Sequence, residues 1–160
     1  MNIRHATIKD LDAITAVEAE CFPAAEAATY ESIKGRLEVF ADHFWLLEDG
    51  DTMVGFVNGM ATDLPDLCDE MYEDAHMHDP KGAWQMIFGV DTIPAYRRRG
   101  CAEMVLNRVI EDTRKAGRKG LVLTCKDRLV HYYAKFGFVS EGVSDSAHGG
   151  AVWYEMRLTF

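Results

Sequence analysis

The sequence predicts the α/β (α+β) class, a mixed β-sheet with helices on both faces, in one domain over residues 1–160. First, 160 residues with 48% hydrophobic content suffice for one core, and such a chain buries roughly two-thirds of its unfolded surface. Second, the hydrophobic periodicity switches repeatedly between strand and helix spacing along the chain. Third, an apolar segment, residues 83–93, is typical of a central strand, and an amphipathic helix follows it after a short loop. Strands interleaved with helices favour a layered sheet.

The N-terminal part is predicted to contain a strand, two helices and a hairpin. Apolar residues at helical spacing define both helices, and Phe22-Pro23 ends the first because a residue before proline avoids the helical region. Asp49-Gly50 between two apolar segments is a strong hairpin signal. In order, we expect a strand at 3–7, helices at 10–21 and 30–40, and strands at 44–47 and 53–60.

The remainder is predicted to alternate strands with helices. A long loop, 62–82, leads to the central strand, and Gly117 is a plausible cap for the helix that follows it. Asp127 is suited to cap a short helix that runs to about residue 136. In order, we expect a strand at 83–93, a helix starting at 100–102, a strand at 120–125, the short helix, and strands at 139–143 and 151–158.

The distribution of charge indicates the chemistry of the partners. A net charge of -9 argues against nucleic acid as the main partner. Residues 91–135 nevertheless hold 11 Lys and Arg against 5 Asp and Glu, a local charge of +6. One basic segment in an acidic protein indicates an anionic cofactor at one place and a cationic partner elsewhere.

Cysteine usage and hydropathy predict a cytoplasmic protein. The cysteines Cys21, Cys68, Cys101 and Cys125 are widely spaced and include no C-x-x-C pair, which favours free thiols over a disulfide framework. The N-terminus has no apolar run of secretory length. No segment approaches the length of a membrane span, so we expect no membrane partner.

The segment Arg97-Arg98-Arg99-Gly100-Cys101-Ala102 joins the central strand to the next helix. The first N–H groups of a helix lack internal partners and favour an anion, and arginines add forked donors for phosphate oxygens. Gly100 allows close backbone approach. The alternative reading of the segment is a solvated basic turn. Cys101 is interpreted separately, as a small residue in a tight loop or as a thiol made reactive by the arginines beside it.

A second motif, Tyr133-Ala134-Lys135-Phe136-Gly137-Phe138, ends a helix and turns into a strand. The order strand, R-x-x-G-x-A, helix, strand and Y-x-K-x-G-F resembles the GNAT family of acyl-CoA N-acyltransferases along nearly the whole chain. The segment 123–133 is more narrowly similar to the arylalkylamine (serotonin-type) branch. The resemblance implies a mostly antiparallel seven-stranded sheet whose central strands splay apart, with Gly89 as a candidate for the bulge that begins the splay.

The resemblance also implies a co-substrate and its binding residues. Acetyl-CoA would place its pyrophosphate on the loop and its pantetheine arm on the edge of the central strand, and no metal is expected. Tyr133 occupies the position of the general acid that protonates the leaving thiolate. The implied cofactor residues are Val90, Asp91, Thr92, Arg97, Arg98, Arg99, Gly100, Cys101, Ala102 and Glu103.

The acceptor and the general base are less well defined. The arylalkylamine branch carries two catalytic histidines where this chain has Met86 and Phe88, which cannot accept a proton. A base could come from His131, His148 or the acidic loop, or the proton could leave through water. Residues expected near the acceptor are Phe22, Tyr72, Phe88 and His131.

The loop from Asp63 to Asp79 carries seven acidic residues and no Lys or Arg. It is interpreted as a guide for a cationic amine, with Tyr72 available for cation–π contact, or as a merely solvated loop. The sequence His76-Met77-His78-Asp79 lacks the further ligands that a metal site needs.

The expected function is transfer of an acetyl group from acetyl-CoA to a primary amine of a small molecule, by direct attack in a ternary complex. The alternatives are acetylation of protein or peptide amines, and a catalytically weak acyl-CoA-binding sensor module. A homodimer is expected to form, if at all, through residues 151–160 as an edge strand.

Overall fold

The computed structural model describes residues 1–160 and contains two β-sheets. The first sheet has the order β1-β2-β3-β6, with every neighbouring pair antiparallel. Its strands are β1 (Asn2–His5), β2 (Phe44–Asp49), β3 (Thr52–Asn58) and β6 (Gly89–Thr92). The predicted hairpin at Asp49-Gly50 joins β2 to β3, with Gly50 in the left-handed region at φ +59°.

The second sheet has the order β4-β5-β7-β9-β8. The pair β5–β7 is parallel and the other pairs are antiparallel. Its strands are β4 (Ala61–Thr62), β5 (Trp84–Ile87), β7 (Gly120–Cys125), β8 (Val139–Val143) and β9 (Tyr154–Thr159).

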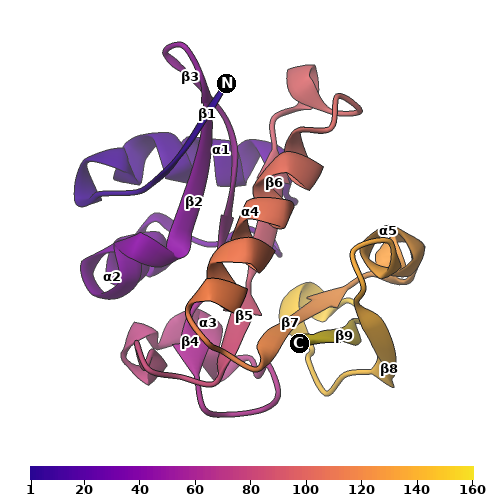
Figure 1. Ribbon diagram of the computed structural model, residues 1–160. Helices are drawn as coiled ribbons and strands as arrows, with labels where there is room; N and C mark the ends of the chain where they lie inside the picture. Colours follow the sequence, from indigo (N-terminus) through magenta and orange to yellow (C-terminus); the bar gives the residue numbers. More distant parts are fainter.

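Helices cover both faces of the sheets, as predicted (Figure 1). On one face, α1 (Leu11–Cys21) and α2 (Tyr30–Phe40) pack on each other, and α1 contacts β3 and β6. On the other face, α4 (Cys101–Lys115) contacts β2, β3, β6 and β7 and so bridges the two sheets. Two short helices, α3 (Glu70–Glu73) and α5 (Val130–Ala134), flank the second sheet.

The predicted central strand, 83–93, is interrupted at Phe88. Its first half, β5, runs beside β7 as far as the pair Ile87–Leu123, whereas its second half, β6, pairs only with β3. Gly89 lies opposite Asn58, and the Phe88 N–H also donates to the Asn58 carbonyl at 2.7 Å. Two successive residues, Phe88 and Gly89, thus face the single residue Asn58 of β3, and this arrangement is a β-bulge. The structure therefore has the expected splay, and it begins at Phe88 and Gly89.

The fold differs from the expectations in three places. The residues 154–159 of β9 lie between β7 and β8, so the segment 151–160 is not the free edge strand that was expected. On this side of the second sheet the edge strand is β8, where Val139 and Val143 are exposed. Asp127 makes no side-chain cap, because it lies inside the 3-10 turn that precedes α5. The expected seven strands become nine because β4 is added and residues 83–93 divide.

None of the helices combines the length and apolar character needed to cross a membrane. All four cysteines are free thiols, and Cys101 and Cys125 are buried. Cys101, the first residue of α4, packs in the core, which favours its interpretation as a small packing residue.

Candidate functional site

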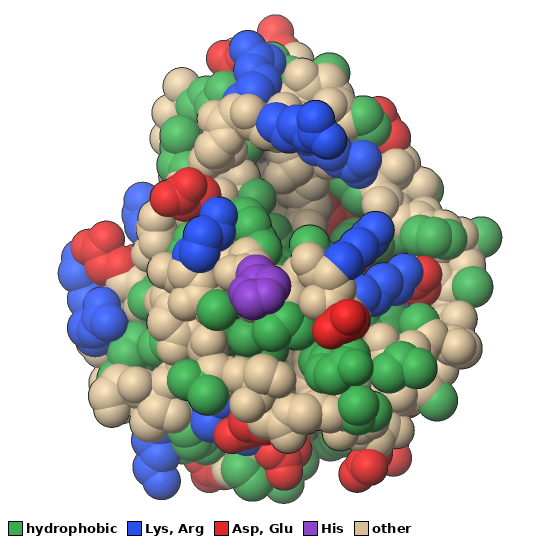
Figure 2. Space-filling view, turned by 90° about the vertical axis from the view of Figure 1, so that its right-hand side faces the viewer, with side chains coloured by type: hydrophobic (Ala, Val, Ile, Leu, Met, Phe, Trp, Pro, Cys, Tyr) green, Lys and Arg blue, Asp and Glu red, His purple; other side chains and the backbone are tan.

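Two adjoining cavities lie where β6 and β7 separate. The larger has a volume of about 560 Å³ and the smaller about 220 Å³. Figure 2 shows a hollow on this side of the molecule with Lys and Arg side chains at its rim. The residues that line both cavities are Cys21, Phe22, Val90, Leu129 and Tyr133. The two spaces therefore form one path with Tyr133 at the junction.

The basic loop forms one end of this path. Gly100 is in the left-handed region at φ +77° and caps α4 without a side-chain hydrogen bond, so the first N–H groups of α4 keep no partner within the protein. Arg98 also adopts a positive φ, +62°, which is unusual for a residue with a side chain. Thr92, Arg97 and Ala102 line the smaller cavity beside this turn.

The three arginines of the loop have different surroundings. The Arg97 Nε donates to the Thr92 carbonyl at 3.0 Å, which ties the loop to the end of β6. The Arg99 guanidinium lies 4.8 Å from the centre of the Tyr96 ring. All three side chains are exposed, so their charges face the solvent around the helix start.

The edge of β6 forms the wall between the loop and the larger cavity. The Ile93 N–H donates to the Val54 carbonyl at 2.9 Å, so Ile93, and by alternation Asp91, direct their backbone groups toward β3. The N–H and C=O of Val90 therefore point away from β3, to the side from which β7 has diverged. The backbone N–H and C=O of Val90 are therefore available for hydrogen bonds with a ligand that lies along this strand edge.

Tyr133 lies on α5 at the junction of the cavities and is 8% exposed. Its ring packs edge-on against Tyr132 at 5.1 Å and against Phe138 at 6.2 Å. Burial, with smaller contributions from Tyr132 and Cys125, raises the pKa of Tyr133 above its usual value. The phenol is therefore protonated at neutral pH, as a proton donor must be.

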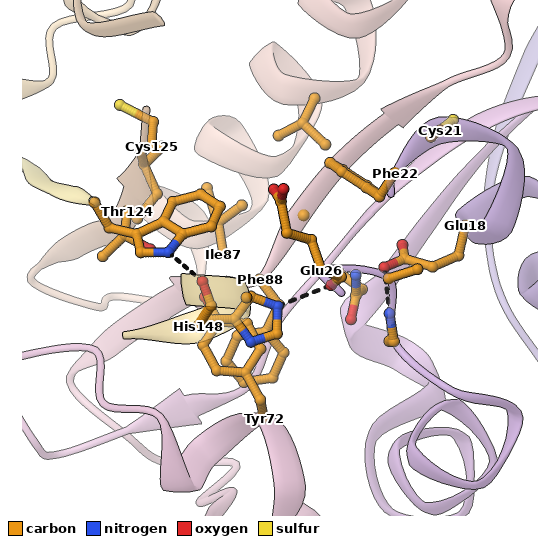
Figure 3. Close-up of a pocket in the computed structure, with 18 of the residues that line it drawn as sticks. Glu18, Cys21, Phe22, Glu26, Tyr72, Ile87, Phe88, Thr124, Cys125 and His148 are labelled. Carbon is orange, nitrogen blue, oxygen red and sulfur yellow. Dashed lines mark hydrogen bonds between the residues drawn. The ribbon is translucent and has the colours of Figure 1, made fainter. Parts of the chain in front are cut away.

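The larger cavity has aromatic walls. Figure 3 shows Phe22 from the end of α1 on one side, Thr124 and Cys125 of β7 on the other, and Tyr72, Phe88 and His148 below. Tyr72 stacks on His148 with ring centres 5.0 Å apart and lies 4.7 Å from Phe88. Three of the four residues expected near the acceptor, Phe22, Tyr72 and Phe88, therefore line one cavity.

His148 belongs to the loop between β8 and β9. Its Nε2 donates to the Glu26 carbonyl at 2.8 Å, shown dashed in Figure 3. A carbonyl oxygen only accepts, so Nε2 carries a hydrogen in this contact. The Trp153 Nε1 donates to the His148 carbonyl at 2.8 Å and fixes the loop.

Among the predicted acceptor and strand residues, two have side chains that lie elsewhere; the loop residues Arg98, Arg99, Gly100, Cys101 and Glu103 also line neither cavity. His131 is exposed on α5 and lines neither cavity, because helical geometry turns it about 200° from Tyr133. The Asp91 side chain is buried on the α1 side of β6 and also lines neither cavity, so only its backbone borders the path. Strand alternation explains this, since Val90 and Thr92 face the smaller cavity.

The acidic loop reaches the site through α3. Asp69, Tyr72 and Glu73 line the larger cavity, whereas Asp66 lies away from it and pairs with Arg157 at 2.7 Å. Asp69 accepts from the Ser146 hydroxyl at 2.6 Å and from the Ala147 N–H at 3.1 Å. This part of the loop therefore anchors the β8–β9 segment that carries His148.

Two buried charged residues escaped the sequence analysis: Glu18 on α1 and Arg36 on α2. Glu18 and Arg36 both line the larger cavity. A signal for them was present, because Glu18 stands seven residues after Leu11, and Arg36 three after Ile33, on the apolar stripes of their helices. A charge inside such a stripe is rare without a partner.

The sequence profile of the Acetyltransferase (GNAT) family matches residues 11–138. The chain belongs to this family. It is therefore an enzyme of the acyltransferase class, and the predicted fold class is confirmed. A search of curated proteins gave no match.

Solved structures of the GNAT fold superpose on nearly the whole chain. The GphF GNAT-like decarboxylase in complex with isobutyryl-CoA has a TM-score of 0.85 at 22% identity, with 99% of each chain covered. The loading GNATL domain of CurA from Lyngbya majuscula also has a TM-score of 0.85, at 16% identity, with 99% of this chain and 96% of that chain covered. The PaiA N-acetyltransferase from Thermoplasma acidophilum in complex with coenzyme A has a TM-score of 0.73 at 14% identity, covering 99% and 98%. At these identities the likeness concerns the fold.

Proposed function

We propose that this GNAT enzyme transfers the acetyl group of acetyl-CoA to the primary amine of a small molecule, by direct attack in a ternary complex with Tyr133 as general acid. The observation that carries the proposal is the meeting of the two cavities at Tyr133. A donor entering from the basic loop and an acceptor entering from the aromatic cavity would meet beside that hydroxyl.

The donor side of the path suits CoA. The helix start at Gly100 with three arginines around it supports a pyrophosphate there. The free edge at Val90 supports the amide groups of the pantetheine arm, and the residues of the smaller cavity, Thr92, Arg97 and Ala102, border the way between them. CoA species in two of the superposed structures are consistent with this placement.

The acceptor side suits a cationic amine with an apolar body. Four carboxylates, Glu18, Glu26, Asp69 and Glu73, line the larger cavity against the cations Arg36, Lys126 and Arg128. Tyr72, Phe88 and Phe22 supply aromatic faces for a cation or a ring. These walls favour an arylalkylamine-like acceptor, in agreement with the segment 123–133.

The chemistry requires two proton transfers. A lysine-like ammonium of pKa about 10.4 must lose a proton, at a cost of about 4–5 kcal/mol at pH 7. The CoA thiol has a pKa of about 8.5, so a phenol that donates to the departing sulfur lowers the barrier by a modest amount. Backbone N–H groups of the splayed strand would stabilise the tetrahedral oxyanion.

A thiol-release assay with acetyl-CoA and a panel of small amines tests this function. We expect turnover with at least one amine, and a kcat about 10-fold to 100-fold lower in Tyr133→Phe, because general acids contribute at least this much. Tyr30→Phe, at the exposed start of α2, serves as the control and keeps the wild-type rate. Turnover unchanged in Tyr133→Phe would contradict the role of the tyrosine, and binding without any turnover would favour the sensor alternative.

A second candidate is decarboxylation of a carboxyacyl-CoA. One of the superposed structures is described as a GNAT-like decarboxylase, and the larger cavity holds Thr124, Arg128 and His148 as possible partners for a carboxylate or thioester oxygen. In this reaction the bond between the α-carbon and the carboxylate breaks, and CO₂ leaves. The electron pair of the broken bond stays on the acyl group as an enolate, and the α-carbon of the enolate then takes up a proton. This reaction deprotonates no amine, so it needs no base on the central strand. That would account for Met86 and Phe88 at the positions where the arylalkylamine branch has histidines.

Incubation with malonyl-CoA, followed by mass spectrometry of the CoA species, separates the two candidates. Decarboxylation would yield acetyl-CoA without any amine present. The primary proposal expects malonyl-CoA to persist, with acetyl-CoA consumed only when an amine is added.

A further inference from the structure

Three buried charged side chains converge beside Gly89, the bulge residue between the two halves of the central strand. Glu18 from α1 is 7% exposed, Asp91 from β6 is 3% exposed and Arg36 from α2 is 4% exposed. A Cβ placed on Gly89 would lie 3.1 Å from the Asp91 Oδ1 and 4.0 Å from the Glu18 Oε1. Both carboxylates therefore border the one position in the strand that lacks a side chain.

The hydrogen bonds of this cluster are incomplete. The Glu18 Oε2 accepts from the Ala28 N–H at 2.9 Å, shown dashed in Figure 3, and its other oxygen is left toward Gly89. Both carboxylate oxygens of Asp91 are buried without a donor, and the Nε of Arg36 is buried without an acceptor. The Arg36 guanidinium instead donates to the Asn58 side chain and to the Tyr72 carbonyl, each at 3.1 Å.

The charges of this cluster do not cancel, because two buried carboxyl groups lie beside one guanidinium. Burial, and then the negative charge of Glu18, raise the pKa of Asp91 well above its usual value, and the positive charge of Arg36 only partly opposes this. These effects favour the protonated form of Asp91, which offsets the excess of negative charge.

We propose that Glu18 and Asp91 form the proton acceptor of the acyl transfer, with Glu18 as the catalytic base at the cavity wall and Asp91 as its positioning residue. This inference rests on the proposed amine acylation. It assigns to α1 the task that two histidines at positions 86 and 88 of the central strand would perform.

Two of the other carboxylates at the cavity are already engaged, Glu73 is exposed, and His148 is held through its Nε2. The Glu26 carboxylate bonds to the Lys126 Nζ at 2.9 Å, and Asp69 holds Ser146 and Ala147. Glu18 differs because it lies beside the bulge, where the thioester end of a pantetheine arm on Val90 would arrive. The charged and titratable groups that face it are Arg36 from α2, Asp91 from β6, Cys21 from its own helix and Tyr72 from α3.

The proton balance of the step is complete. A substrate ammonium gives one proton to the Glu18 carboxylate, and the nitrogen lone pair forms the C–N bond with the thioester carbonyl. The C–S bond breaks as Tyr133 gives its proton to sulfur, and the second proton on nitrogen restores Tyr133. Glu18 then releases its proton to solvent, so that one ammonium and one acetyl-CoA yield one amide, one thiol and one proton.

The test is the pH dependence of kcat/KM, with kcat and the affinity for acetyl-CoA measured separately. In Glu18→Gln we expect kcat to fall about 100-fold or more, as for loss of a general base. The affinity for acetyl-CoA should stay within twofold, and the acidic limb of the profile should disappear. In Glu18→Ala, added formate should restore part of the rate.

Asp91→Asn should keep most of kcat while the acidic limb moves to lower pH. Glu20→Gln, exposed on the same helix, is the matched control and should behave as wild type.

The outcomes separate this inference from the proposed function. If the wild-type enzyme acylates no amine, the proposed function fails. If it does, and Glu18→Gln keeps the wild-type rate and acidic limb, only the assignment of Glu18 is overturned. Should Glu18→Gln lose acetyl-CoA binding, Asp91→Asn decides, because an unmoved acidic limb there overturns the carboxyl pair.

Discussion

At the residue scale, the two glycines that bound α4 form a matched pair, because both have a positive φ and open space at the Cβ position. Gly100 caps the start of the helix at φ +77° and Gly117 follows its end at φ +78°, and no atom lies within 4 Å of the Cβ position of either. Any difference between substitutions at the two positions therefore reflects what approaches the protein there. At Gly100 the group that is proposed to bind is the pyrophosphate of acetyl-CoA.

We predict that Gly100→Asp weakens acetyl-CoA binding at least tenfold, about 1.4 kcal/mol, because a carboxylate would stand where the pyrophosphate approaches. Gly117→Asp imposes the same backbone requirement at the other end of the helix and should leave the affinity unchanged. Isothermal titration calorimetry with acetyl-CoA measures both. Equal affinities in the two variants would mean that the loop does not hold the phosphates.

At the element scale, the interruption of the central strand at Phe88 is the feature that creates the candidate site. It ends the pairing of the central strand with β7, opens the edge of β6 and brings Gly89 beside Glu18 and Asp91. The local sequence predicted most elements well, since α2, β7 and β8 have the expected bounds. Periodicity is a local property and suffices for such segments.

Other elements depend on contacts that no local pattern carries. The helix α3 has four residues and is held by tertiary packing of Met71, so the sequence showed only a loop. The interior place of β9 follows from strand order, which joins residues far apart in the chain. Likewise, Glu18, Arg36 and Asp91 come together from three elements, and their encounter could not be predicted from the stripes alone.

The junction of α2, β2 and the 3-10 turn Ala75–Met77 contains two histidines in edge-on contact. The rings of His43 and His78 are 4.7 Å apart; His43 Nδ1 lies 2.8 Å from the Gln85 side-chain oxygen, and His78 Nδ1 accepts from the Ala61 N–H at 3.1 Å. Burial lowers the pKa of His43, and burial with the neighbouring His43 lowers that of His78 to about 4. The folded protein therefore holds both rings neutral.

The fold should lose stability on acidification through these histidines. Between pH 6.5, the unperturbed value, and about pH 4, the unfolded chain binds more protons than the folded one, so the free energy of unfolding falls as the pH falls. Thermal unfolding at a series of pH values measures this. His78→Asn, which keeps an acceptor for Ala61, should flatten the dependence, whereas His76→Asn, at an exposed position, should not. An identical slope in His78→Asn and wild type would refute the assignment.

At the scale of the whole molecule, the distribution of charge and the topology both separate a basic donor side from an acidic acceptor side. The basic segment 91–135 supplies the loop, α4 and the β7–α5 wall, and the acidic remainder supplies α1 and α3 around the larger cavity. The divided sheet places these two parts on either side of one path, with Tyr133 at its middle. An anionic donor and a cationic acceptor would thus approach from opposite ends.

The most direct test of this account is one mass-spectrometric product analysis. The enzyme is incubated with acetyl-CoA and a mixture of aryl- and alkylamines, and in parallel with malonyl-CoA alone, and both the amides and the CoA species are quantified. The account predicts an N-acetylated amine formed in equal amount with free CoA, and intact malonyl-CoA. Absence of every amide together with conversion of malonyl-CoA to acetyl-CoA would contradict it.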